Sequence, residues 1–447
     1  MPFLVLPKPA IRSSVAEAVP EAFTAEMVPR NCHITAPPKV TGIKPIPVKG
    51  QMISFVSPDS TYAVTRRLFD GAKKKILIGI YDFTASYMKE LVINAIHRGV
   101  KVSLMLDVDN DDEEQLMKDL ARLGAQTVTA PSCANKKPTH YFPSSHEKVI
   151  VIDDAWCIVQ SGNYSNNSIP FNEKDGGDPA HFVTGNRDMG IAINSKELSA
   201  FFTKVLKADI KLELNIEAVE SLMTRSMLPD LVDALPELLP KQFFPSKTFT
   251  PTKNIDILPV LSPDNYMKVI PALLAAAKKS ILIENQYIKS TQPQVSLLLE
   301  AIAEAKKNNP RLDVRIILGK LFSKADVPKE KDNVANMKAK YKLSLGTNIR
   351  YIDTKRLVHC HNKLIIIDGK TILVSSQNWS DSAVSKNREA GVLLTYPEIA
   401  TYYTKVFESD WSTALKTVPV PGKATVAPEA LQSAKFIKVV PADYEEV

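Results

Sequence analysis

The stretch HCHNKLIIIDGKTILVSSQNW, residues 359–379, indicates how the second half of the chain folds. It contains two unbroken apolar runs, LIII and TILV, on either side of Asp368 and Gly369. An Asp-Gly pair between short apolar runs is typical of a tight turn that joins two strands. His361 and Lys363 stand two residues apart before the first run, and such residues project from the same face of an extended backbone. The pattern predicts a buried hairpin with an imidazole and an ammonium in one site.

The same pattern occurs earlier in the chain. The spacing His-x-Lys-x-x-x-x-Asp has two copies, formed by His146, Lys148 and Asp153, and by His361, Lys363 and Asp368. A polar segment follows each copy at the same interval, QSGN at 160–163 and SSQN at 375–378. Each half then carries an acidic tripeptide, Asn-Arg-Asp at 186–188 or Asn-Arg-Glu at 387–389. Chance agreement across three spaced elements is improbable, so we infer an internal duplication.

The duplication extends upstream of the motifs. Ser-Pro-Asp at 57–59 matches Ser-Pro-Asp at 262–264, and the apolar strand at 75–78 matches that at 280–283. A helical stretch that ends in Ala-Lys-Lys lies between these elements in both halves. We therefore expect two copies of one domain, with their motifs meeting at a pseudo-twofold axis.

Strand and helix patterns alternate along each half, which predicts an α/β fold: two pseudo-twofold-related α/β/α sandwich lobes with mixed sheets. The expected organisation is a proline-rich N-terminal arm at 1–50, a first lobe at 51–210, an interlobe linker at 211–254, a second lobe at 255–412 and a C-terminal tail at 413–447.

On these residues the sequence resembles the phospholipase D superfamily, whose hallmark is the duplicated His-x-Lys-x-x-x-x-Asp motif followed by a Gly-Ser-x-Asn segment. The resemblance covers about residues 51–412. The segment IENQY at 283–287 also resembles a strand of many phospholipases D. The chain departs from the pattern where Gln160 and Ser375 replace the usual glycine, and where Gly162 occupies the variable position.

The residue types suit attack on a phosphodiester. One imidazole must be neutral to attack phosphorus and the other protonated to release the alcohol, which the pKa of histidine allows near neutrality. Lys148 and Lys363 would stabilise charge on the non-bridging oxygens. Asn163 and Asn378, with Ser161 and Ser376 behind them, would offer neutral donors to the same phosphate.

The resemblance implies the roles of individual residues. It implies a two-step reaction through a phosphohistidine, with His146 as the nucleophile and His361 as the acid and then the base. Asp188 and Glu389 match the carboxylates that orient the two histidines in the family. Asp153 and Asp368 would have a structural role, away from the phosphate.

Composition is that of an ordinary soluble protein, with 447 residues, 45% hydrophobic and 23% charged. A net charge of +7 favours an anionic partner, either nucleic acid or acidic lipid. Because no run of about eighteen apolar residues occurs, we expect no transmembrane segment. The short apolar opening at 3–6 is followed by prolines, which argues against a signal peptide. We expect a cytoplasmic protein that contacts a membrane peripherally if its substrate is a lipid.

The four cysteines lie at positions 32, 133, 157 and 360, and no two of them have the short spacing typical of a paired motif. We expect reduced thiols, in keeping with a cytoplasmic location. His359, Cys360 and His361 are potential metal ligands, but no distant partner accompanies them. We expect no metal and no cofactor, and a monomer that holds one complete site.

Three functions remain open at this point. A phospholipase D-type hydrolase or phosphatidyltransferase is favoured by the fused motifs and the IENQY strand, and a nuclease is favoured by the basic charge. A scaffold without activity is disfavoured by the intact motifs.

Three segments also have two interpretations each. Residues 164–186 form either a gate or a solvated insertion, the apolar linker either a clamp or a lipid-contacting lip, and the lysine-rich stretch 323–342 either a solvated helix or a guide for an anionic substrate.

Overall fold

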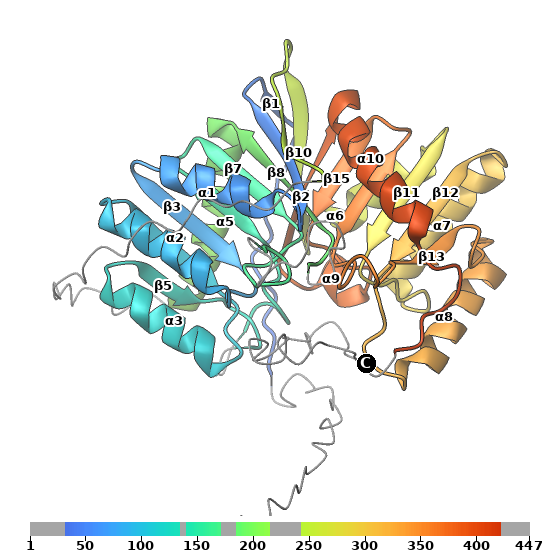
Figure 1. Ribbon diagram of the computed structural model, residues 1–447, viewed down its shortest axis with the longest axis horizontal. Helices are drawn as coiled ribbons and strands as arrows, with labels where there is room; N and C mark the ends of the chain where they lie inside the picture. Colours follow the sequence, from blue (N-terminus) through green and yellow to red (C-terminus); the bar gives the residue numbers. More distant parts are fainter. Residues whose placement is uncertain (1–31, 135–139, 171–184, 215–242, 422–447) are drawn as a thin grey trace, which may run out of the picture.

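The computed structural model describes residues 32–134, 140–170, 185–214 and 243–421. They form two lobes that lie side by side, the first in blue to green and the second in yellow to red (Figure 1). The expected gate or insertion, the interlobe linker and both ends of the chain lie partly outside the described residues.

The first lobe is built on a mixed eight-stranded sheet. Its strands are β2 (Met52–Ser57), β3 (Lys75–Ile80), β4 (Lys101–Leu106), β5 (Gln126–Thr129), β6 (Val149–Ile152), β7 (Trp156–Gln160), β8 (Asp188–Asn194) and β9 (Lys247–Phe249). Their order is β5-β4-β3-β6-β7-β8-β2-β9. The pairs β3–β4 and β4–β5 are parallel, and the motif strand β6 is antiparallel to β3.

The second lobe repeats this sheet. Its strands are β1 (Ile46–Val48), β10 (Ile255–Ser262), β11 (Ser280–Asn285), β12 (Asp313–Leu318), β13 (Ile349–Tyr351), β14 (Lys363–Ile367), β15 (Thr371–Ser375) and β16 (Glu389–Thr395). Listed from the parallel edge, their order is β13-β12-β11-β14-β15-β16-β10-β1. The two orders correspond strand by strand, which confirms the predicted fold of two similar mixed-sheet lobes.

The lobes exchange one edge strand each. β1 comes just before β2 in the chain, but it pairs with β10 in the second sheet. β9 comes just before β10, but it pairs with β2 in the first sheet. β1 lies inside the expected N-terminal arm and β9 inside the expected interlobe linker. Both segments therefore contribute backbone hydrogen bonds that tie the lobes together.

The helices cover the sheets in layers. They are α1 (Thr61–Gly71), α2 (Ser86–His97), α3 (Asp111–Arg122), α5 (Lys196–Leu214), α6 (Tyr266–Ala275), α7 (Pro293–Asn308), α8 (Asp326–Tyr341), α9 (Asp381–Ser385) and α10 (Pro397–Thr413). Apolar residues of α1, α2 and α3 pack on the outer face of the first sheet, and those of α6, α7 and α8 on that of the second. Among the described residues, no helix combines the length and the apolar character needed to cross a bilayer.

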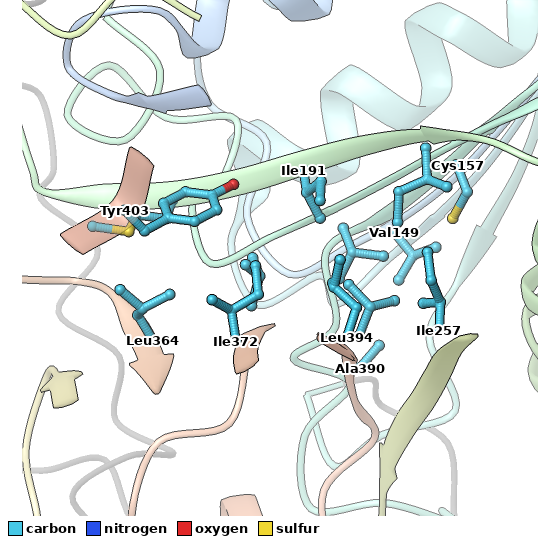
Figure 2. Close-up of a cluster of buried hydrophobic side chains, with 14 of the residues drawn as sticks. Val149, Cys157, Ile191, Ile257, Leu364, Ile372, Ala390, Leu394 and Tyr403 are labelled. Atoms are coloured by element: carbon cyan, nitrogen blue, oxygen red, sulfur yellow. The ribbon is translucent and has the colours of Figure 1, made fainter. Parts of the chain in front are cut away.

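The apolar runs after the motifs are buried on both faces, which explains why they do not alternate with polar residues. Val149 and Val151 of β6 belong to the core between the lobes, whereas Ile150 and Ile152 belong to the outer core of the first lobe. The apolar residues of β14 likewise alternate between the core between the lobes and the outer core of the second lobe. The inner faces of both sheets, with α5 and α10, form one continuous apolar core (Figure 2).

The motif aspartates lie at the turns that end the motif strands. Asp153 and Asp368 both have a φ of 54°, within the left-handed region that a tight hairpin turn requires. The carboxylate of Asp153 accepts the backbone N–H groups of residues 73, 74 and 75 at 2.8, 2.7 and 2.9 Å. Asp368 accepts the three equivalent donors at 278–280. Burial by itself would raise the pKa of Asp153, but these donors lower it on balance.

Two buried arginines connect the lobes. Arg187, from the first acidic tripeptide, donates to Asp410 of α10 at 2.6 and 3.2 Å and to the Ser57 carbonyl at 2.7 Å. Asp59 lies 3.4 Å from the same guanidinium. Each contact to α10 crosses from the first lobe to the second.

Arg388, from the second tripeptide, repeats this arrangement in the opposite direction. It donates to Asp209 of α5 at 2.8 and 3.1 Å and to Asp264 at 2.7 Å. Removing one partner of a buried ion pair strongly destabilises the folded protein, because the other charge is left buried and unpaired. Each tripeptide therefore holds its own lobe against a helix of the other lobe.

One expectation about the cysteines is wrong. Cys32 and Cys133 form a disulfide, with Cα atoms 5.8 Å apart, whereas Cys157 and Cys360 are buried free thiols. The pair is separated by 101 residues, and it is brought together because the segment around Ile34 bridges to His140. Spacing in the sequence could not reveal such a pairing. Since disulfides persist in oxidising compartments, the cysteines no longer support a cytoplasmic location.

We expect Asp410→Asn to lower the free energy of unfolding by roughly 3 kcal/mol, because Arg187 would keep a buried charge with a single weak carboxylate partner. Urea unfolding measures the change. Glu398→Gln, on the exposed side of the same helix, is the control and should leave the unfolding midpoint unchanged. Equal midpoints for the two variants would contradict an interlobe role of this ion pair.

Candidate active site

The two motifs place their histidines and lysines at equivalent ends of β6 and β14. His146 and His361 precede these strands, and each lysine follows its histidine by two residues, so both side chains leave the same face. Lys148 Nζ donates to the carbonyl oxygen of His146 at 2.6 Å, and Lys363 Nζ donates to that of His361 at 2.6 Å. All four side chains are buried, and each ammonium is held against the backbone that carries its own histidine.

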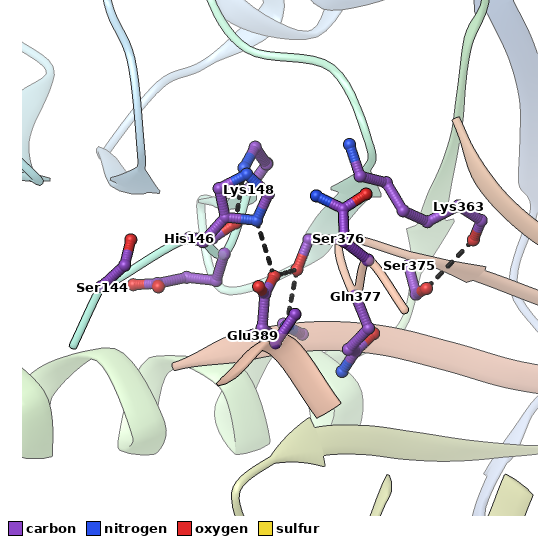
Figure 3. A network of polar contacts seen from close by, with 12 residues as sticks. Ser144, His146, Lys148, Lys363, Ser375, Ser376, Gln377 and Glu389 are labelled. Atoms are coloured by element: carbon purple, nitrogen blue, oxygen red, sulfur yellow. Dashed lines mark hydrogen bonds and ion pairs between the residues drawn. The ribbon is translucent and has the colours of Figure 1, made fainter. Parts of the chain in front are cut away.

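The histidines take their carboxylate partners from the opposite lobes. His146 Nδ1 lies 2.8 Å from Glu389 Oε2, and His361 Nδ1 lies 2.9 Å from Asp188 Oδ1 (Figure 3 shows the first pair). The sequence suggested that these acids orient the histidines, but not that the pairs cross between the lobes. Neither lobe by itself contains a histidine with its carboxylate.

Backbone hydrogen bonds fix the same crossing. The N–H of His146 donates to the carbonyl of Arg388 at 2.8 Å, and the N–H of His361 donates to the carbonyl of Arg187 at 3.0 Å. Because Asp188 and Glu389 directly follow these arginines, the residues that tie the lobes together also position the carboxylates. The arginines were not among the predicted site residues, although their place in both tripeptides is a signal that could have identified them.

The serines of the polar segments contact the carboxylates. Ser161 Oγ donates to Asp188 Oδ1 at 2.7 Å, and Ser376 Oγ donates to Glu389 Oε2. The expectation was that these hydroxyls stand behind the asparagines as donors to a phosphate. In this structure their hydrogens are used to hold the carboxylates in place. Gly162 allows the close approach, since a Cβ there would lie 3.2 Å from Asp188 Oδ2.

The asparagines lie beside the lysines, in environments that differ between the lobes. Asn378 Nδ2 and Lys363 Nζ both donate to Gln286 Oε1, at 3.3 Å each. In the first lobe the equivalent position after β3 is Tyr81, whose ring lies 5.0 Å from Lys148 Nζ and 4.8 Å from the His146 ring. Asn163 is buried nearby, and among the described residues its Oδ1 has no hydrogen-bond partner.

Gln286 and Tyr81 were not among the predicted site residues, although Gln286 lies in the IENQY segment on which the family resemblance partly rests. Both follow the strand that pairs with the motif strand, so an alignment of the two halves would have placed them at the site.

The charges of the two half-sites act on each other. Burial lowers the pKa of His146 well below its ordinary value, and Lys148 and Lys363 lower it further. The pKa of His361 is also lowered on balance, because burial, Lys363 and Lys148 outweigh Asp188, which raises it. The pKa of each histidine is thus lowered by the lysine of the other lobe, as expected if the two half-sites form a single centre. Among the described residues, His146 Nε2 is buried and has no hydrogen-bond partner, so this nitrogen remains available for chemistry.

Potential metal ligands come together elsewhere. Within the described ranges, a group of three such side chains is formed by Cys32, Cys133 and His140, and its two sulfurs are joined in the disulfide. His359 and His361, which flank Cys360, have ring centroids 6.5 Å apart. The expectation that the reaction uses no metal stays a prediction.

Comparisons with known proteins agree with this geometry. The profile of the family described as cardiolipin synthase, PLD-like domain matches residues 65–210 and 270–411. The mitochondrial cardiolipin hydrolase of Chlamydomonas reinhardtii is 35% identical over 57 residues, which are 13% of this chain and 26% of that protein. The mitochondrial cardiolipin hydrolase of Danio rerio is 29% identical over 66 residues, 15% of this chain and 29% of that protein. The matched region thus spans less than a third of either relative.

A solved structure resembles almost the whole chain. The phosphatidylserine synthase of Haemophilus influenzae superposes with a TM-score of 0.55 at 15% identity, covering 88% of this chain and 94% of that one. At this identity the similarity concerns the fold. The family profile matches both halves of the chain, and each half carries one copy of the motif. The chain belongs to the phospholipase D superfamily.

Proposed function

We propose that this protein is a metal-independent phosphodiesterase that acts through a phosphohistidine, in phospholipase D-type hydrolysis or transphosphatidylation of phospholipids. The observation that carries the proposal is the crossed arrangement of the histidine-carboxylate pairs. Because each Nδ1 is bonded to a carboxylate, the reactive nitrogen of each ring is Nε2. Two such rings at one buried centre, each with a lysine, suit an in-line displacement at phosphorus.

In the first step, Nε2 of His146 attacks phosphorus while the bond from phosphorus to the alcohol oxygen breaks. His361, in its protonated form, gives its proton to the departing oxygen. In the second step, His361 takes a proton from water or from an acceptor alcohol, whose oxygen attacks phosphorus. The bond between phosphorus and His146 breaks, and both histidines return to their starting states.

The roles follow from the surroundings of the two rings. His146 has the pKa that is lowered further, so it remains neutral and nucleophilic, whereas Asp188 favours the protonated form of His361. Lys148 and Lys363, with Asn163 and Asn378, would stabilise the negative charge on the non-bridging oxygens. We assign Ser161 and Ser376 to holding the carboxylates, and Asp153 and Asp368 to the turns that end the motif strands.

The choice of lipid as substrate is supported by the family profile and by the names of both curated relatives. A net charge of +7 favours the alternative, a nuclease. The purified chain should hydrolyse cardiolipin or phosphatidylglycerol in vesicles faster than it cleaves single-stranded DNA. Activity should survive EDTA, because fixed lysines take the place of a metal ion. Faster cleavage of DNA would favour the nuclease. A loss of activity in EDTA that a divalent ion restores would contradict the metal-independent mechanism.

The covalent intermediate provides a second prediction. His361→Asn should still attack a nitrophenyl phosphodiester, whose leaving group needs no proton, and should accumulate the adduct because the second step lacks its base. Mass spectrometry without acid treatment would locate the phosphoryl group on the peptide that contains His146. His146→Asn should form no adduct, and His97→Asn, away from the site, should behave as the wild type. An adduct on His361 in the His146→Asn variant would reverse the two roles.

The pH profile gives a third prediction. Asp188 raises the pKa of His361, so Asp188→Asn should lower this pKa, and His361 should lose its proton at a lower pH. The alkaline limb of kcat/KM, which reports the proton donor of the free enzyme, should therefore move toward acid. Asp256→Asn, at an exposed position, should leave the limb unchanged. A limb that stays in place in Asp188→Asn, or that moves toward alkaline pH, is inconsistent with His361 as the acid.

A further inference from the structure

A cavity of about 370 Å³ adjoins the candidate active site on one side. It lies at the ends of β11 and β12 and is bordered by α8, the helix formed by the lysine-rich stretch. Its lining includes Gln286, Gly319, Lys320, Glu330 and His359. All of its lining residues belong to the second lobe.

Two lining residues connect the cavity to the reacting groups. Gln286 accepts hydrogen bonds from Lys363 and Asn378, both members of the second half-site. His359 stands two residues before His361, and their ring centroids are 6.5 Å apart. A ligand in the cavity would therefore approach the phosphate from the side of His361.

The two copies differ at the strand end that borders the cavity. β4 ends at Leu106 and is followed by Asp107, which accepts hydrogen bonds from the Ser144 hydroxyl and the Ser145 N–H, each at 2.9 Å. β12 ends at Leu318 and is followed by Gly319. A Cβ at Gly319 would lie 2.2 Å from Cε1 of His359, so the absence of a side chain makes room for this imidazole.

Donors to an anion lie together on the cavity wall. His359 Nδ1 accepts the backbone N–H of Lys320 at 3.1 Å, which leaves the proton of the neutral ring on Nε2. His359 is 4% exposed, and its Nε2 has no hydrogen-bond partner among the described residues. The ammonium of Lys320 lies 5.3 Å from the Phe322 ring centroid, and no carboxylate of the described chain pairs with it. A buried donor and a cation without a carboxylate partner fit a negatively charged group.

The acidic residues of the wall are engaged by the fold or lie at the rim. Glu330 accepts the Tyr351 hydroxyl at 2.6 Å, and Asp326 accepts the Ser323 N–H at 3.1 Å. Asp332 is exposed. The part of the cavity next to His359 is thus the part that suits an anion.

We propose that this cavity binds the alcohol half of the phosphodiester, the group that leaves in the first step and attacks in the second, and that it selects a small alcohol bearing a phosphate. The proposal rests on the proposed function and specifies its substrate class. The volume is that of a small-molecule site, which suits a compact headgroup better than a polymer strand. Lys320 would be the residue that determines specificity, with His359 as a second donor to the same phosphate.

Calorimetric titration of the full chain with glycerol 3-phosphate tests the site without requiring turnover. Lys320→Met should weaken binding by roughly tenfold to a hundredfold, since it removes a charge-assisted hydrogen bond from a partly buried site. Lys320→Arg keeps the charge and should retain most of the affinity. Lys331→Met, on the exposed part of α8, is the matched control and should bind as the wild type does.

Glycerol and inorganic phosphate separate this cavity from the catalytic centre. Glycerol should bind weakly and independently of Lys320. Inorganic phosphate should bind at both places, so Lys148→Met and Lys320→Met should each remove part of its binding, whereas Lys148→Met should leave glycerol 3-phosphate bound. The proposal is overturned if glycerol 3-phosphate does not bind, if Lys148→Met abolishes its binding while Lys320→Met has no effect, or if Lys331→Met weakens it as much as Lys320→Met.

The pocket and the proposed function can fail separately. Binding that depends on Lys320, in a protein that turns over no phosphodiester, would retain the pocket and reject the enzyme. If the protein turns over a nitrophenyl phosphodiester but binds glycerol 3-phosphate equally well without Lys320, the proposed function is retained and the pocket is rejected.

Discussion

The hydrogen bonds between each histidine and a carboxylate of the other lobe are the constraint on which the site depends. They require β8 and β16, the strands that begin with Asp188 and Glu389, to lie beside the motif of the opposite lobe. The apolar core between the sheets supplies the area that holds the lobes together, but it is non-directional. The buried arginines, and the backbone bonds beside them, fix the register that brings each carboxylate to its histidine.

Several differences between the copies lie at or beside the site. The middle residue of the first motif is Glu147, facing Gly79 of β3, whereas the second motif has Asn362, which donates to Glu284 of β11 at 2.8 Å. Burial raises the pKa of Glu147 and that of Glu284 to about 8 each, with Asp209 adding to the first and Asp410 to the second. A buried carboxyl thus acts on Arg388 from the first motif, just before β6, and on Arg187 from β11.

Other differences distinguish the two sides of the reaction. An aromatic ring lies beside Lys148, and an amide lies beside Lys363. Asp107 follows β4 in the first lobe, whereas Gly319 follows β12 in the second lobe and borders a cavity. A symmetric fold would offer the two ends of a phosphodiester the same surroundings. On the side of His361, an amide lies beside the lysine and a cavity borders the strand end, which suits the proposed site for the departing alcohol.

Much of this protein could be predicted from local pattern. The two motifs, the buried hairpins after them and the duplicated lobes follow from residue spacing, because period-2 geometry and turn chemistry depend on neighbours in the chain. The identity of the orienting acids followed from the resemblance to a family. The arginines lie in the repeated tripeptides and Gln286 lies in the IENQY segment, but their roles depend on contacts with distant residues, and Tyr81 is identified only because it occupies the position equivalent to Gln286.

Sequence by itself determined the lobes, the motif strands and the residue types of the site. Tertiary structure alone decided the crossed pairing of His146 with Glu389 and of His361 with Asp188, the exchange of β1 and β9, and the disulfide between Cys32 and Cys133. Each of these joins residues far apart in the chain, and no local rule specifies which of two equivalent partners is chosen. The choice depends on how the two inner sheet faces pack, since only that packing sets which strand end meets which motif.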